Sequence, residues 1–437
     1  MLILPSVVRY EKRNRMNFLF VSRWGLIHDL AMQVQKEGHE VKYCILSKED
    51  REVGDGFVQK VENWEEFKTW ADVIIFDDSD FGDVCEKLRK EGKAVVGGTK
   101  YTDKLEFDRD FGTAEMKAAG LQTLPSWEFT SFDTAIEFVK SNPSRYVVKP
   151  SGDAQNEKVL SYVGQEEDGR DVITMLERYK KGWSKKMKAF QVQKFVAGVE
   201  VAIGAFFNGK DFILPAFINF EHKRMMNGDI GPATGEMGTT GFWASDTKLY
   251  RETLAKMRDR IQGYVGYFDI NCIVNARGFY PLEVTPRYGY PTINLQMEGV
   301  LSKWGELHAA CARGENFVLR TKRGLQVAVV VAVPPFPFVD PGAFKRFSED
   351  APIIFKKPLP EGVHPCDVKL VEGEWHLTGN SGYALVVTGS GSTMEDARRE
   401  CYNRVRNIMI PNMFYRTDIG ERWMRDSDLL QTWGALT

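Results

Sequence analysis

The stretch that decides the fold is Gln193-Lys194-Phe195-Val196-Ala197-Gly198-Val199-Glu200. An apolar strand runs into a glycine turn, and the chain then returns with a carboxylate. The exposed main chain of such a turn can hydrogen-bond the edge of a planar ring while Glu200 accepts from hydroxyl groups. The alternative is a plain β-hairpin with a glycine bend. This stretch alone does not separate the two interpretations.

Two further features flank this stretch in the chain. Tyr146-Val147-Val148-Lys149-Pro150 is a strand that ends in a lysine, whose ammonium can contact phosphate oxygens, although a solvated strand end is the simpler interpretation. Asp269 and Asn271 lie on a later strand and Glu283 on the next one, so the three can converge across a hairpin. Oxygen ligands of this kind suit Mg²⁺, whereas each residue singly is more simply a surface side chain. The order of lysine, turn and carboxylates indicates an ATP site.

The surrounding pattern predicts an α/β and α+β multidomain protein. Apolar strands alternate with amphipathic helices at first, which indicates a parallel sheet covered on both faces, and mixed patterns follow. We expect a leader or loose extension at 1–16, an N-terminal Rossmann-like parallel sheet at 17–121, a central α+β domain at 122–320 and a small C-terminal α+β domain at 321–437.

Composition excludes several classes of function. The chain has 437 residues, with 58 basic and 60 acidic side chains and a formal charge of −2, so nothing at long range attracts nucleic acid or an acidic membrane. No apolar run is long enough to span a membrane. The six cysteines are scattered without a CxxC pair, which favours neither zinc nor disulfides. We expect a cytoplasmic protein with small-molecule partners, either a monomer or a small homo-oligomer.

The run EHKRMMNGDIGPATGEMG at 221–238 resembles the DHKR…GDxGPNTGGMG signature of glycinamide ribonucleotide synthetases, which belong to the ATP-grasp superfamily. Other segments are similar to that family in the same order, over about residues 17–424. They are Leu105–Arg109, Val147–Lys149, Gly198–Glu200, Leu282–Pro291 and Tyr415–Gly420.

The resemblance implies a central ATP-grasp domain and an ATP- and Mg²⁺-dependent ligase, in purine biosynthesis, that joins glycine to an amine through an acyl phosphate. It implies catalytic roles for Lys223, Arg224, Asp229 and Arg287, and ATP contacts from Arg109, Lys149, Lys194, Phe195, Val196 and Glu200. It implies substrate contacts from Gly25, His28, Asp78, His222, Gly235, Met237 and Gly238, and metal ligation by Glu283 with Asp269 or Asn271.

The chain also departs from the family pattern. The family's GxGGREHAL loop reads SRWGLIHDL at 22–30, which introduces Trp24 and Leu26, and its AAGKG loop is replaced by DAQNEK at 153–158. Arg109 replaces a lysine and Thr285 an asparagine. Because apolar bulk replaces glycine and charge in the first loop, we expect an amino acid to be activated but a ribose phosphate to bind less well. Three hypotheses remain: the family's own reaction, a ligase with another amine acceptor, and a non-catalytic nucleotide-binding protein.

Overall fold

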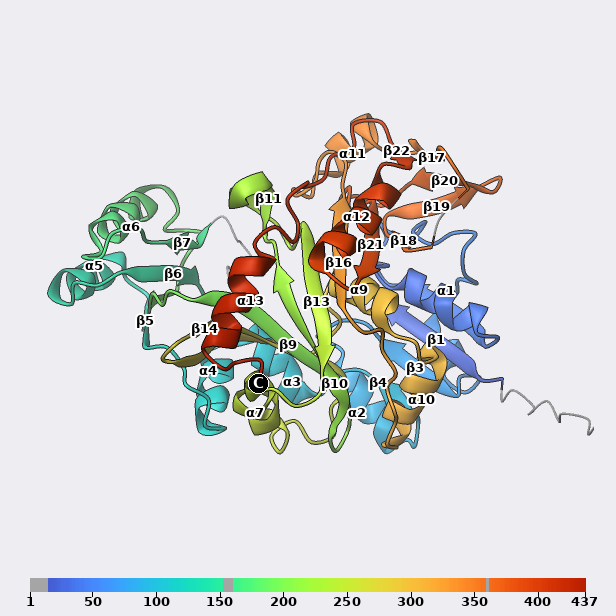
Figure 1. The fold of residues 1–437 in the computed structure, drawn as a ribbon, viewed down its shortest axis with the longest axis horizontal. Helices are drawn as coiled ribbons and strands as arrows, with labels where there is room; N and C mark the ends of the chain where they lie inside the picture. The colour runs from blue at the N-terminus through green and yellow to red at the C-terminus, as the bar shows by residue number, and fades with distance from the viewer. Residues whose placement is uncertain (1–14, 152–159, 359–360) are drawn as a thin grey trace, which may run out of the picture.

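The computed structural model describes residues 15–151, 160–358 and 361–437, and begins with a parallel sheet in the order β2-β1-β3-β4 (Figure 1). The strands are β1 (Asn17–Ser22), β2 (Glu40–Ile45), β3 (Val73–Phe76) and β4 (Val95–Val96). Helices α1 (His28–Lys36), α2 (Gly82–Lys90), α3 (Lys100–Phe107) and α4 (Arg109–Ala118) accompany it, with the 3-10 turn η1 (Trp64–Phe67). The strands are mostly apolar, and β3 and β4 wholly so, as sheets with helices on both faces require. The predicted Rossmann-like sheet is confirmed.

A small antiparallel sheet, β5-β8-β6-β7, forms the lobe that projects on the left of Figure 1. Its strands are β5 (Ser126–Phe129), β6 (Tyr146–Pro150), β7 (Tyr162–Val163) and β8 (Phe190–Lys194), and helices α5 (Phe132–Ser141) and α6 (Arg170–Gly182) pack on it. The segment 153–158, on which the sequence departs from the family, lies outside the described residues.

The centre of the molecule is an eight-stranded antiparallel sheet in the order β15-β14-β9-β10-β13-β16-β21-β18. Its first part is β9 (Val199–Asn208), β10 (Phe212–Glu221), β13 (Gly238–Ala244), β14 (Val265–Asn275) and β15 (Gly278–Thr285). A two-stranded ribbon, β11 (Arg224–Met226) and β12 (Ile230–Ala233), joined by η4 (Asn227–Asp229), projects from the end of β10. The short helices α7 (Lys248–Glu252) and α8 (Leu254–Met257) precede β14.

The sheet continues across residue 320, where we expected a domain to end. Its last strands are β16 (Leu325–Val331), β18 (Val363–Pro365) and β21 (Leu385–Gly391). A four-stranded sheet, β19 (Val368–Val371), β20 (Glu374–Leu377), β17 (Pro352–Phe355) and β22 (Ile408–Met409), adjoins them. Helices α9 (Thr292–Gly299), α10 (Trp304–Arg313), α11 (Pro341–Phe347), α12 (Met394–Val405) and α13 (Trp423–Thr432) complete the chain. The central and C-terminal regions therefore share one sheet.

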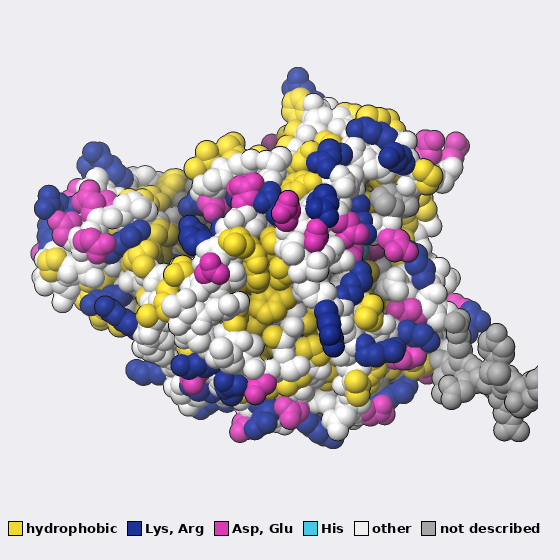
Figure 2. Space-filling view, in the orientation of Figure 1, with side chains coloured by type: hydrophobic (Ala, Val, Ile, Leu, Met, Phe, Trp, Pro, Cys, Tyr) yellow, Lys and Arg dark blue, Asp and Glu magenta, His cyan; other side chains and the backbone are white. Residues whose placement is uncertain are grey.

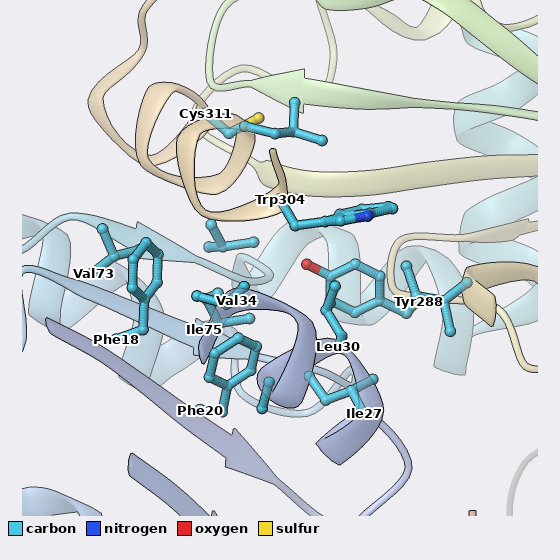
Figure 3. Packing of buried hydrophobic residues seen from close by; sticks show 14 of the residues in the cluster. Phe18, Phe20, Ile27, Leu30, Val34, Val73, Ile75, Tyr288, Trp304 and Cys311 are labelled. Atoms are coloured by element: carbon cyan, nitrogen blue, oxygen red, sulfur yellow. The ribbon is translucent and has the colours of Figure 1, made fainter. Parts of the chain in front are cut away.

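One apolar cluster joins the N-terminal sheet to later parts of the chain. Phe20 and Leu30 of the first sheet and its helix lie in the same core as Tyr288, after β15, and Trp304, at the start of α10 (Figure 3). A hydrogen bond of 2.7 Å between Asp29 Oδ2 of α1 and His364 Nδ1 of β18 ties the same sheet to the C-terminal region. These contacts fix the N-terminal loops against the central sheet.

Basic and acidic side chains are interspersed over the face shown in Figure 2, as the small net charge suggests. Among the described helices, none combines the length and apolarity needed to cross a membrane.

Candidate active site

Three cations meet where the small lobe approaches the central sheet. Lys149 is the residue before the last of β6, Arg109 begins α4, and Lys223 follows β10. Burial, together with the charges of Arg109 and Lys223, lowers the pKa of Lys149 to about 8 against the pull of Glu283 and Glu200. Three neighbouring cations repel one another unless an anion lies between them, so the arrangement suits a polyphosphate.

Lys223 is the centre of this site. Its Nζ lies 2.7 Å from Glu200 Oε1, 3.0 Å from Glu221 Oε2 and 3.9 Å from Glu283 Oε1. Desolvation works against the charged form, but the three carboxylates outweigh it and hold the pKa of Lys223 above its ordinary value. Carboxylates from β9, β10 and β15 therefore converge on one cationic position.

The hairpin β14–β15 has the predicted geometry. Asn271 lies directly opposite Glu283, and Asp269, two residues earlier, lies opposite Thr285, so their side chains share a face. Asn271 Nδ2 donates to Glu221 Oε2 at 2.9 Å, while its buried Oδ1 has no hydrogen-bond partner among the described residues. Burial raises the pKa of Asp269 to about 7, with the charge of Glu221 adding to the effect.

These oxygens fit Mg²⁺ as it is held beside nucleotides. No three His, Cys, Asp or Glu side chains in the described part of the chain form a closed metal site. A nucleotide-bound Mg²⁺ needs only one or two carboxylates, because phosphate oxygens and water complete its shell. Glu283 offers a carboxylate, and the unpartnered Oδ1 of Asn271 offers a further oxygen on the same face. Ligation by Glu283, Asp269 or Asn271 remains a prediction.

The glycine turn between Lys194 and Val199 connects two different sheets. Its first strand, β8, belongs to the small lobe, and β9 belongs to the central sheet, so the two do not form a hairpin. Lys194 is exposed, whereas Phe195 and Val196 are half-buried. The Arg145 guanidinium lies 3.6 Å from the centre of the Phe195 ring and covers it. The segment 195–198 is thus a hinge between the lobe and the sheet, and its ATP contacts remain a prediction.

Arg287, predicted to be catalytic, lies between two carboxylates of the N-terminal region. Its Nε is 3.0 Å from Glu106 Oε1 and 3.3 Å from Asp78 Oδ1. Both partners hold the pKa of Arg287 above its ordinary value, against desolvation. The structure thus brings Asp78 and Arg287 together, at a junction between the N-terminal sheet and the end of β15.

The rest of the 221–238 run is held by the C-terminal segment. Asp229 Oδ1 accepts from the buried Arg416 at 2.7 Å, and Arg224 donates to the Gly231 carbonyl at 3.0 Å. His222 is buried, and desolvation lowers its pKa to about 3. Three predicted substrate residues follow in the chain. Met237 is fully buried and Gly238 pairs with β16, whereas a Cβ added at Gly235 would meet only open space.

The loop after β1 takes a conformation that requires glycine. Gly25 has φ +84, and a Cβ there would approach Val53 to 3.0 Å. His28, at the start of α1, is buried between Tyr43 and Phe57, and its Nδ1 contacts the Gly25 carbonyl at 3.0 Å. The predicted substrate contacts of Gly25 and His28 remain predictions, since the imidazole faces the interior of the N-terminal region.

Two carboxylates near the site are absent from the predicted set. Glu221 begins the quoted run and contacts both Lys223 and Asn271. Glu236 stands where the family signature has glycine, and it lines a cavity of about 400 Å³ with Trp24, Leu26, Tyr290 and Tyr383. The signal that could have revealed Glu236 is a charged residue within a glycine-rich run.

Comparisons with known proteins agree with this geometry. Residues 106–293 match the family model of the phosphoribosylglycinamide synthetase ATP-grasp (A) domain. A phosphoribosylamine–glycine ligase of Thermotoga maritima is 26% identical over 411 residues, covering 90% of this chain and 96% of the relative. One from Streptococcus pneumoniae is 25% identical, covering 79% and 82%.

Solved structures share the fold. The crystal structure of the Thermotoga maritima phosphoribosylamine–glycine ligase has a TM-score of 0.70 at 23% identity, covering 92% of this chain and 100% of that one. A biotin carboxylase domain from Hydrogenobacter thermophilus, solved with MgADP and bicarbonate, has a TM-score of 0.64 at 12% identity, covering 96% and 98%.

The fold and the site define an ATP-grasp protein. More particularly, the chain is similar over most of its length to phosphoribosylamine–glycine ligases, and residues 106–293 match the ATP-grasp domain of the phosphoribosylglycinamide synthetases.

Proposed function

We propose that this protein is an ATP-dependent carboxylate–amine ligase that activates a small amino acid, glycine by preference, as an acyl phosphate and transfers it to an amine. The observation that carries the proposal is the convergence of Lys149, Arg109 and Lys223 with Glu200 and Glu283 at the junction of two sheets. The names of the similar ligases support the choice of reaction.

The proposed reaction has two balanced steps. The amino acid carboxylate oxygen attacks the γ-phosphorus of ATP, and ADP leaves with the electron pair of the broken P–O bond. The amine then attacks the acyl carbon, the C–O bond to phosphate breaks, and the proton released from nitrogen ends on phosphate. Both steps develop charge on oxygen, so fixed cations and exclusion of water are the main requirements.

The residues of this chain meet those requirements in distinct ways. Lys149 and Arg109 would bind the phosphates, and Glu200 would accept from the ribose hydroxyls. In the structure Glu200 holds Lys223 at 2.7 Å, so nucleotide binding would redistribute the partners of that lysine. Mg²⁺ held by Glu283, with Asp269 or Asn271, would neutralise charge on the transferring phosphoryl group.

The same proposal includes the cellular location, the oligomeric state and the domain division. We place the protein in the cytoplasm as a monomer or small homo-oligomer, and keep the division at 17–121, 122–320 and 321–437 as working domains. The last two of these share the central sheet.

Trapping the acyl phosphate tests the proposal without knowledge of the acceptor. Hydroxylamine is a small nucleophile that converts an acyl phosphate to a hydroxamate. We expect MgATP, hydroxylamine and one or a few small amino acids, glycine among them, to give ADP and hydroxamate in equal amounts. The control Glu374→Gln changes an exposed carboxylate of β20 and should match the unmodified protein. ADP release that no amino acid stimulates would favour the non-catalytic hypothesis.

A further inference from the structure

A cavity of about 400 Å³ lies where the loop after β1, the glycine-rich run and the C-terminal region meet. We call it the acceptor pocket. Its wall combines Trp24 and Leu26 of the loop after β1, Glu236 of the glycine-rich run, Tyr290 after β15, and Phe336 and Tyr383 of the C-terminal region. Glu236 lies near the cation cluster, because the N–H of the next residue, Met237, donates to the carbonyl of His222, the neighbour of Lys223, at 2.8 Å.

The charged groups of the acceptor pocket are all of one sign. Asp50, Glu236 and Asp367 line it and are only 4%, 5% and 3% exposed. None of the described residues that line it is lysine, arginine or histidine. Buried carboxylates without a cation are costly, and burial raises the pKa of all three, that of Asp367 to about 7. A cationic ligand would be their electrostatic complement.

Two buried polar atoms on the wall lack a partner. Glu236 Oε1 and the Tyr383 hydroxyl make no hydrogen bond within the described part of the chain. Both belong to residues that are more than nine-tenths buried and line the cavity. By contrast, Asp367 accepts from Ser381 at 2.6 Å and Asp50 from Ser47 at 2.6 Å. Since buried polar groups are nearly always paired, the free acceptor on Glu236 points to a ligand that donates.

The remaining surface is aromatic and apolar. Trp24 is 48% exposed at the mouth, and Tyr290, Phe336 and Tyr383 complete the wall. Aromatic faces attract cations and pack well against an apolar body. They offer little to a phosphate group, which each ionised carboxylate of the pocket would also repel.

We propose that the acceptor pocket binds a primary amine as its ammonium form, with an apolar, ring-sized body and no phosphate group. The role as acceptor rests on the proposed function, whereas the binding preference does not. Before the amine attacks, one ammonium proton passes to a pocket carboxylate. The neutral amine then forms the C–N bond and releases phosphate.

A set of matched ligands tests this preference by titration calorimetry on the intact protein. The 2-phenylethylammonium ion is the probe, 2-phenylethanol its uncharged counterpart, and ribose 5-phosphate the anionic competitor. We expect the ammonium ion to bind at least about tenfold more tightly than the alcohol, the gain from a charge-assisted hydrogen bond, and ribose 5-phosphate to bind more weakly than either. Glu236→Gln should remove most of the advantage of the ammonium ion, and Glu374→Gln should retain it.

Each other result overturns the proposal: tighter binding of ribose 5-phosphate, equal binding of alcohol and ammonium ion, or no binding of the ammonium ion. Unchanged ammonium affinity in a folded Glu236→Gln variant does the same. If that variant does not fold, the ligand comparison on the unmodified protein still decides. Hydroxamate formation separates the two proposals, because hydroxylamine needs no acceptor pocket. Hydroxamate with the wrong ligand preference refutes only the pocket, whereas the expected preference without hydroxamate refutes only the ligase.

Discussion

The ammonium of Lys223, between β10 and β11, lies 2.7 Å from the carboxylate of Glu200 in β9, although the sequence predicts a catalytic role for the first residue and an ATP contact for the second. The pair connects the expected ribose position to the end of β10, where the glycine-rich run begins. A change at either residue should therefore affect both nucleotide binding and the chemical step.

Glu200→Ala should weaken ATP binding by about 1–3 kcal/mol, the cost of losing hydrogen bonds that involve a charged group. The variant also releases Lys223, so kcat should fall together with affinity. Equilibrium binding of ATP and single-turnover ADP formation measure the two effects. The exposed Glu374→Ala serves as the control. Unchanged ATP affinity in Glu200→Ala would remove the residue from the nucleotide site.

Glu283→Gln should abolish turnover while leaving the fold intact, because the side chain is 56% exposed and a neutral amide is a poor Mg²⁺ ligand. Steady-state rates measured over a range of Mg²⁺ concentrations, beside thermal unfolding of the same samples, check both halves of this prediction. If the variant keeps full Mg²⁺-dependent activity, the metal is bound elsewhere.

Arg416→Met should destabilise the protein strongly. The guanidinium is 1% exposed and contacts Asp229 and Asp418, each at 2.7 Å. Breaking a buried ion pair by removing one partner costs about 3–5 kcal/mol. The matched change Arg399→Met removes a helical pair in which the arginine is 61% exposed, and should cost about 1 kcal/mol or less. Equal losses in urea unfolding would mean that Arg416 does not anchor the 227–229 turn.

Glu298 should make stability depend on pH in acid. Burial alone would raise its pKa, but hydrogen bonds and charges from Lys322, Arg404 and Ser390 outweigh it and lower the pKa to about 2. A carboxylate with a depressed pKa stabilises the fold above its unfolded pKa, about 4.3, and loses this contribution as pH falls toward about 2. The free energy of unfolding of Glu298→Gln should therefore lie below that of the unmodified protein at pH 6, and the gap should narrow steadily as the pH falls from about 4 toward about 2. A constant gap would contradict the account.

Short-range sequence patterns predict much of the fold and the central residues of the site. The strand at 73–76 is wholly apolar, the strand at 199–208 is largely so, and the pairing of β14 with β15 follows from the hairpin turn, although a bulge after Asn271 sets that residue opposite Glu283. The lysine, hinge and carboxylate series was found because each member lies in or beside a strand. Those signals are short in range and can be read without the fold.

Contacts between segments far apart in the chain could not be predicted from local sequence patterns. The pairing of β13 with β16 carries the central sheet across residue 320, yet nothing local marks which strands become neighbours. The contact of Asp229 with Arg416 spans 187 positions, so its carboxylate was assigned by resemblance alone. Glu236 is polar within a glycine-rich run, but its lack of a partner becomes visible only when the cavity around it is known.

The most direct test of the central claim follows an oxygen atom. An amino acid that forms hydroxamate is labelled with ¹⁸O in its carboxylate and incubated with the protein, MgATP and hydroxylamine, and the phosphate is examined by ³¹P NMR. If an acyl phosphate forms, its C–O bond breaks in the second step, so each phosphate should carry one ¹⁸O from the amino acid. Phosphate that accompanies ADP without the label would show that water, and not the carboxylate, attacks ATP, and would contradict the account.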